Sequence, residues 1–146
     1  ANTAAVVGDY ATSVISRKGE TLHTVSYSSG DLNAYCFGSG GLMLGVRSYS
    51  GNARIALTRL DADGRESDPL LITEELQAID YDGARLALLT SGGLSVYDRA
   101  LRPLWENTSV AGARSVCLTA DGAVWATYSK HAERVSSSSD TSEGVK

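Results

Sequence analysis

The residues with the clearest capacity for chemistry are two short acidic turns, one of which begins like a calcium-binding loop. In residues 61–66, Asp-Ala-Asp-Gly-Arg-Glu, two carboxylates at alternate positions precede a glycine, as in loops that wrap oxygen ligands around a hard cation. The pattern stops there, because no third Asp precedes the glycine and no Glu stands at the twelfth position. Residues 79–83, Ile-Asp-Tyr-Asp-Gly, form a second acidic turn. We predict hairpin turns at both places and no metal site.

The histidines and serines form no set that predicts catalysis. His23 and His131 lie far apart in the sequence, with no cysteine or carboxylate at the spacing of a zinc site. The sequence contains neither Gly-x-Ser-x-Gly nor the glycine-rich lysine motif of a phosphate-binding loop. We therefore predict no catalytic residues and no cofactor.

Tyrosine is the residue type that most suggests a binding surface, since the chain has 7 Tyr and 1 Phe. At strand ends, tyrosine combines apolar area with a polar tip and can bind a sugar or a peptide. Tyr35, Tyr49, Tyr81 and Tyr97 are the candidate ligand-facing aromatics. The alternative is that they are ordinary strand residues whose hydroxyl groups reach solvent at a sheet edge.

Composition limits the classes of protein to which the chain can belong. The 146 residues are 42% hydrophobic and 21% charged with a net charge of -4, values typical of a globular domain. The scattered basic residues do not form the basic stripe that nucleic-acid binding requires. No apolar run is long enough to span a membrane, so any anchor is expected outside this chain. The two cysteines, Cys36 and Cys117, lie in apolar runs, and their oxidation state is left open.

The elements that position these residues come from an internal repeat. Residues 34–44, 78–88 and 117–126 each contain an apolar strand, a turn with glycine and a second apolar strand. A second unit of strand, turn and strand alternates with the first, at residues 14–22, 58–66 and 96–105. Both series have a spacing of about 40 residues, which is typical of the four-stranded blades of a β-propeller.

The repeat predicts an all-β fold, a partial β-propeller of antiparallel four-stranded blades with about two whole blades and two partial ones. The propeller segment is residues 1–135, and residues 136–146 form a Ser-rich flexible tail. The predicted limits are a partial blade at 1–27, blades at 28–72 and 73–110, and a partial blade at 111–135. Asp-Gly pairs at residues 63–64, 82–83 and 121–122 are the predicted hairpin tips.

An incomplete ring leaves strand edges without neighbours. We expect the strands near residues 4–7 and near residues 116–118 to face solvent in a monomer. Such edges bind another polypeptide through main-chain hydrogen bonds. A second chain or companion fragment that completes the propeller is therefore the expected partner.

The repeat units resemble a known class of propeller. Residues 96–107, Val-Tyr-Asp-Arg-Ala-Leu-Arg-Pro-Leu-Trp-Glu-Asn, are similar to the repeat of pyrroloquinoline-quinone-type and outer-membrane-assembly-lipoprotein-type propellers, in which a strand ends at Asp and resumes with a Leu-Trp pair. Leu104 and Trp105 form that pair, whereas residues 22–23 and 67–68 depart from it. The few lysines, irregular blades and Ser-rich end of the sequence also resemble the C-terminal half of membrane-anchored propeller proteins of Gram-positive gut bacteria. These resemblances imply an extracytoplasmic scaffold and supply no catalytic residues.

The sequence therefore predicts a non-catalytic ligand-binding or protein-interaction scaffold outside the cytoplasm. The alternative is a propeller-type enzyme or binding module that acts on carbohydrate, with active-site residues partly outside this chain. Converging carboxylates would favour the enzyme, and a tyrosine-lined or polar surface would favour the scaffold.

Overall fold

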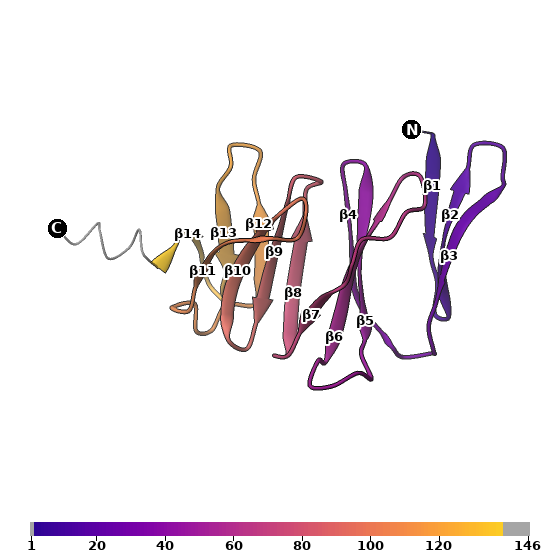
Figure 1. Cartoon of the computed structure of the whole chain (residues 1–146). Coiled ribbons are helices and arrows are strands. Elements are labelled where there is room, and N and C mark those ends of the chain that lie inside the picture. The colour runs from indigo at the N-terminus through magenta and orange to yellow at the C-terminus, as the bar shows by residue number, and fades with distance from the viewer. Residues whose placement is uncertain (1, 139–146) are drawn as a thin grey trace. The chain divides into compact units, whose positions relative to one another are not determined.

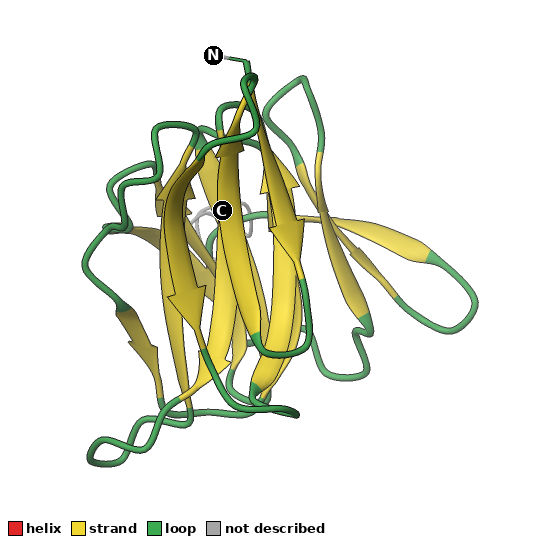
Figure 2. Ribbon diagram, turned by 90° about the vertical axis from the view of Figure 1, so that its right-hand side faces the viewer, coloured by secondary structure: helices red, strands yellow, loops and turns green. Residues whose placement is uncertain are grey.

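The computed structural model describes residues 2–138, and its regular secondary structure is almost entirely antiparallel strand (Figures 1 and 2). Four sheets follow one another along the chain, and in each sheet consecutive strands are neighbours. The first sheet contains β1 (Thr3–Val7), β2 (Ala11–Ser16) and β3 (Thr21–Ser26). The second contains β4 (Leu32–Gly38), β5 (Gly41–Arg47), β6 (Ile55–Asp61) and β7 (Leu70–Ile72).

The third sheet contains β8 (Leu76–Tyr81), β9 (Arg85–Thr90), β10 (Gly93–Asp98) and β11 (Pro103–Asn107). The fourth contains β12 (Ser115–Leu118), β13 (Val124–Thr127) and β14 (Ala132–Val135). The chain divides into two compact units, residues 1–73 and 74–146, so that each unit holds two sheets. No helix in the described part of the chain is long and apolar enough to cross a membrane.

The turns are tight because glycines and aspartates supply the conformations that hairpins require. Gly64, Gly83 and Gly122, the glycines of the three predicted Asp-Gly tips, all have positive φ angles, of 85°, 94° and 91°. Each lies between two paired strands, so these hairpin tips are confirmed.

Each unit has an apolar core between its two sheets. In the first unit, Val14 of β2 packs with Leu42, Leu44 and Leu60 of the second sheet. In the second unit, the buried residues come from both sheets and include Ala87, Leu89, Leu94, Val96, Val116, Val124, Ala126 and Val135. Residues directly opposite in an antiparallel pair face the same side, so each core forms from alternate residues of its strands.

The predicted all-β blade architecture is confirmed. Residues 42–46 and 86–89 belong to β5 and β9, which are the second strands of the two four-stranded sheets, as the repeat predicts. The first residues of the Ser-rich tail, 136–138, are described, and the rest of that prediction lies outside the described residues.

The expectation that residues 116–118 face solvent as a terminal edge is wrong for Val116. It is 7% exposed and packs in the core of the second unit. The reason is that β12 begins its sheet, pairs with β13 and lies beside the third sheet, so that the last strand of the fourth sheet is β14.

The leading sheets of the two units share one register at an offset of 82 residues. Val14 pairs with Ala5 in the first unit, and Val96 pairs with Ala87 in the second. Both sheets also carry a bulge at the same position, directly after Val14 in one and after Val96 in the other. This register places His23 where Trp105 stands, as the sequence predicts. Residues of the two units can therefore be compared position by position.

Candidate functional site

The candidate interaction surface lies along the open edge of β1, which is the first strand of its sheet and pairs only with β2 among the described strands. At the hairpin end the Gly8 N–H donates to the Ala11 carbonyl at 2.9 Å, so that pair is hydrogen-bonded. Bonded and non-bonded pairs alternate along an antiparallel ladder. The N–H and C=O groups of Thr3, Ala5 and Val7 therefore point away from β2, toward the open edge.

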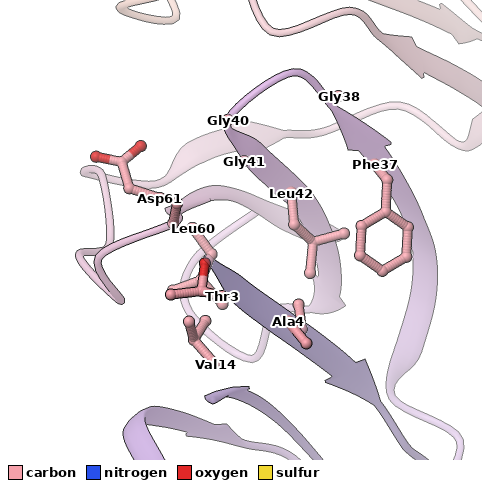
Figure 3. A pocket seen from close by; sticks show the side chains of 12 residues that line it. Thr3, Ala4, Val14, Phe37, Gly38, Gly40, Gly41, Leu42, Leu60 and Asp61 are labelled. Carbon is pink, nitrogen blue, oxygen red and sulfur yellow. The ribbon is translucent and has the colours of Figure 1, made fainter. Parts of the chain in front are cut away.

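A groove of about 210 Å³ runs beside this edge, between the first and second sheets (Figure 3). Its walls are the start of β1, the β4–β5 hairpin and the end of β6, and in Figure 3 the side chains of Ala4, Phe37 and Leu42 border the same space. The hairpin contributes three glycines, Gly38, Gly40 and Gly41, and therefore mostly backbone. One charged side chain, Asp61, lies on the lining, and Arg59 Nε donates to it at 3.1 Å.

An exposed aromatic pair stands on β4 beside the groove. Tyr35 and Phe37 are 53% and 55% exposed, and their rings meet edge to face with centroids 6.2 Å apart. They pair with Leu44 and Leu42 of β5, so they lie on the face of the second sheet that packs against the first. The first sheet covers the two leucines and leaves the aromatic pair uncovered.

The second unit shows how the corresponding residues are covered when a fourth strand is present. The counterparts of Tyr35 and Phe37, counted back from the hairpin, are Val116 and Leu118 of β12, and both pack in the core together with Ala78 of β8. Asp80 of β8 accepts a hydrogen bond from the Leu118 N–H through Oδ2, at 2.7 Å. The exposure of Tyr35 and Phe37 thus follows because no strand of the described residues takes the place of β8 at the edge of β1.

Tyr49 is the most exposed of the predicted aromatics, at 74%. Its hydroxyl lies 2.9 Å from each carboxylate oxygen of the buried Asp31, and the Arg47 guanidinium lies 5.3 Å from its ring centroid. The hydrogen bond to Asp31 is the main cause that raises the pKa of Tyr49 above its ordinary value. This arrangement anchors the end of β5 and holds one face of the ring against an arginine.

Tyr81 and Tyr97 are placed less favourably for a ligand. Tyr81 is 4% exposed, so its ring does not form part of the surface, and we remove it from the candidate set. Tyr97 is half-buried on β10, and burial is the main cause that raises its pKa. None of the four predicted tyrosines lines the groove, but Tyr35 contacts Phe37, which does.

The two histidines lie outside the groove, and each pairs with a glutamate. His23 Nε2 and Glu66 Oε2 are 2.6 Å apart and join β3 to the turn after β6, while His131 pairs with Glu133 at 3.1 Å. Among residues 2–138, no three His, Cys, Asp or Glu side chains gather closely enough to hold a metal ion. Cys36 and Cys117 are thiols whose Sγ atoms donate to the next carbonyl along their strands.

Sequence reasoning missed Phe37, the partner of Tyr35. The sequence pattern could have predicted it. Tyr35 and Phe37 are two positions apart in a strand, so both rings lie on the same face. The count of tyrosines over the whole chain hid that local pattern.

The comparisons with known proteins support the fold and leave the family open. The sequence matches no protein-family model and no curated protein. Among solved structures, BamB from Moraxella catarrhalis superposes with a TM-score of 0.56 at 12% identity, over 85% of this chain and 39% of that one. A HIRA segment gives a TM-score of 0.58 at 16% identity, over 92% of this chain and 48% of that one.

A protein of unknown function from Bacteroides caccae gives a TM-score of 0.53 at 12% identity, over 93% of this chain and 55% of that one. This chain therefore spans between 39% and 55% of the length of these solved chains. The similarity establishes a propeller-type fold.

Proposed function

We propose that this chain is a non-catalytic interaction scaffold that binds a polypeptide partner along the open edge of β1. The observation that carries the proposal is the exposed pair Tyr35 and Phe37 beside a strand edge with outward main-chain groups. Aromatic side chains contribute strongly to protein interfaces, and a strand edge offers hydrogen bonds that any extended peptide can use. The groove between the sheets adds a place for one row of side chains.

Binding to arrayed ligands tests this function. The 146-residue chain is applied to an array of extended synthetic peptides and to a glycan array. The expected result is binding to peptides that is lost in Tyr35→Thr/Phe37→Thr and retained in Tyr10→Thr, a control at another exposed aromatic. Binding to glycans alone would overturn the proposal in favour of the carbohydrate-binding alternative.

The proposed location is outside the cytoplasm. The support is the resemblance of residues 96–107 to outer-membrane-assembly-type propeller repeats, together with the fold similarity to BamB. Fractionation of cells that express the tagged full-length gene product tests it. Recovery of the tag in the cytoplasmic fraction would contradict this location.

A further inference from the structure

The position of β8 in the second unit defines what would fit at the open edge of the first. Ala5 and Val7 of β1 match Ala87 and Leu89 of β9 in the repeat register. Asp80 and Ala78 of β8 lie directly opposite those two residues. A strand at the edge of β1 would therefore place its side chains opposite Ala5 and Val7 in the same way.

The side chains opposite these two positions face the second sheet. Ala5 and Val7 pack against the core of the first unit, so a residue opposite either one points toward β4 and the aromatic pair. In the second unit this space is narrow enough that Ala78 fills one position. The residue opposite Val7 should therefore be small.

The position opposite Ala5 lies near a backbone donor, the N–H of Phe37. Gly38 and Gly41 flank a two-residue turn, so they form the hydrogen-bonded closing pair, and the adjacent Phe37–Leu42 pair is non-bonded. The Phe37 N–H consequently points to the open side of β4. Leu118, its counterpart on β12, has the same orientation, and its N–H donates to Asp80. Both strands also share the thiol-to-carbonyl contact, of Cys36 with Phe37 and of Cys117 with Leu118.

We propose that the open edge of β1 binds one antiparallel strand of a companion polypeptide, with a small residue opposite Val7 and a carboxylate opposite Ala5. The carboxylate accepts a hydrogen bond from the Phe37 N–H, and the strand covers Tyr35 and Phe37. This inference rests on the proposed scaffold function and adds the chemistry of the partner: an extended segment with Ala-x-Asp, or a similar small-x-acidic sequence, on its inward face. The chain itself carries that sequence at residues 78–80.

Isothermal titration calorimetry with an end-capped peptide of residues 75–82 tests the proposal. The 146-residue chain should bind this peptide, and replacing Asp80 of the peptide by Ala should weaken binding about tenfold, as loss of a hydrogen bond to a charged group does. Replacing Ala78 of the peptide by Trp should abolish binding.

Variants of the chain locate the site. Ala5→Pro removes an N–H that points to solvent and leaves the β1–β2 ladder intact, so it should fold and lose the peptide. Should Ala5→Pro fail to fold, Tyr35→Thr/Phe37→Thr serves instead and should weaken binding at least about tenfold. Tyr10→Thr, at an exposed aromatic in the β1–β2 turn, should bind like the parent chain.

Three results would overturn the proposal. Equal binding of the Asp and Ala peptides would refute the carboxylate and leave the scaffold function standing. Absence of peptide binding, together with a dimer in light scattering that Ala5→Pro abolishes, would assign the edge to a second copy of this chain. Peptide binding to this chain that is absent in the full-length gene product would show that another part of the same polypeptide fills the edge.

Discussion

Each unit packs two sheets against each other. Among the described strands, the leading sheet has three strands in the first unit and four in the second, and the following sheet has four and three. Where the fourth strand is present, as β8, the facing residues Val116 and Leu118 are in the core. Where residues 2–138 supply no such strand, Tyr35 and Phe37 remain more than half exposed. Because β1 and β9 share their register, the comparison indicates what the inner strand β8 contributes. It covers apolar side chains of the next sheet and pairs with the edge of β9.

A second difference explains the groove. Arg85 begins β9 in the second unit, and its guanidinium donates to the carbonyls of Gly122 and Thr119, at 2.7 Å and 3.3 Å. The corresponding residue of the first unit is Thr3, which lines the groove. A short side chain thus leaves open the space that an arginine fills in the other unit.

The largest effect is expected from a contact that only the first unit makes. Gly64 follows β6, has a φ of 85°, and a Cβ at this position would lie 2.9 Å from the Cβ of His23. Gly64→Ala should therefore destabilise the first unit by more than about 2 kcal/mol, from left-handed backbone strain and overpacking together.

Hydrogen exchange measured by mass spectrometry checks this prediction and the separation into units. Protection should fall in residues 3–72 and be retained in residues 76–135. Equal loss in both units would show that they unfold together and would break the comparison. Gly51→Ala is the matched control, since it also has a positive φ, of 57°, but no atom within 4 Å of the added Cβ.

The next effect tests the arginine that distinguishes the two units. Arg85→Met retains much of the side-chain volume but loses both carbonyl contacts and the ion pair with Asp82. It should therefore destabilise the second unit by about 1 to 2 kcal/mol. Urea unfolding followed by the fluorescence of Trp105 and Trp125, which both lie in this unit, measures the change. An unchanged midpoint would mean that the guanidinium contributes nothing to stability.

The reciprocal substitution sharpens the comparison. Thr3→Arg should place a guanidinium near the backbone of the β4–β5 hairpin and raise protection of the first unit in hydrogen exchange. Thr3→Met, which adds volume without donors, is the control. A gain of equal size in both variants would assign the effect to filled space alone.

The sequence was sufficient to predict the sheets because strands and turns depend on local pattern. The self-alignment of residues 14–22 with 96–105 corresponds to the register in the structure, and the Asp-Gly pairs are at hairpin tips. The candidate site was less accessible. The exposure of Tyr35 and Phe37 depends on the absence of a neighbouring strand, and the burial of Tyr81 depends on packing between distant segments. Neither property is encoded in the residues near these positions.

A smaller and opposite effect is expected at the β10–β11 turn. Leu101 has a φ of 63°, and the corresponding residue of the first unit is Gly19, with a φ of 84°. The Leu101 N–H donates to the Asp98 carbonyl, and the Gly19 N–H donates to the Ser16 carbonyl. Leu101→Gly should relieve left-handed strain and stabilise the second unit by about 1 kcal/mol, a rise in its melting temperature of about 4 to 8 °C.

Differential scanning calorimetry measures that change. Gly19→Ala is the paired variant and should lower stability by a similar amount, since no atom lies within 4 Å of the added Cβ and only the backbone conformation opposes it. A lower melting temperature for Leu101→Gly would show that the leucine side chain contributes more by contact than its backbone costs.

The smallest effect concerns the same turn and its dependence on pH. Asp98 accepts hydrogen bonds from the N–H groups of Ala100 and Arg102, and Ser16 accepts the corresponding pair from Lys18 and Glu20 through its hydroxyl.

The bond from the Arg102 backbone is the main cause that lowers the pKa of Asp98 below its ordinary value. Because the folded pKa is the lower one, this stabilisation is present above the unfolded pKa of about 3.9 and is lost as pH falls through the folded value. Asp98→Ser, which copies the first unit, should therefore melt below the parent chain at pH 7. The difference should shrink toward zero as the pH falls through the folded pKa of Asp98. A difference in melting temperature that stays constant over this range would mean that the charge of Asp98 is irrelevant and that a serine closes the turn equally well.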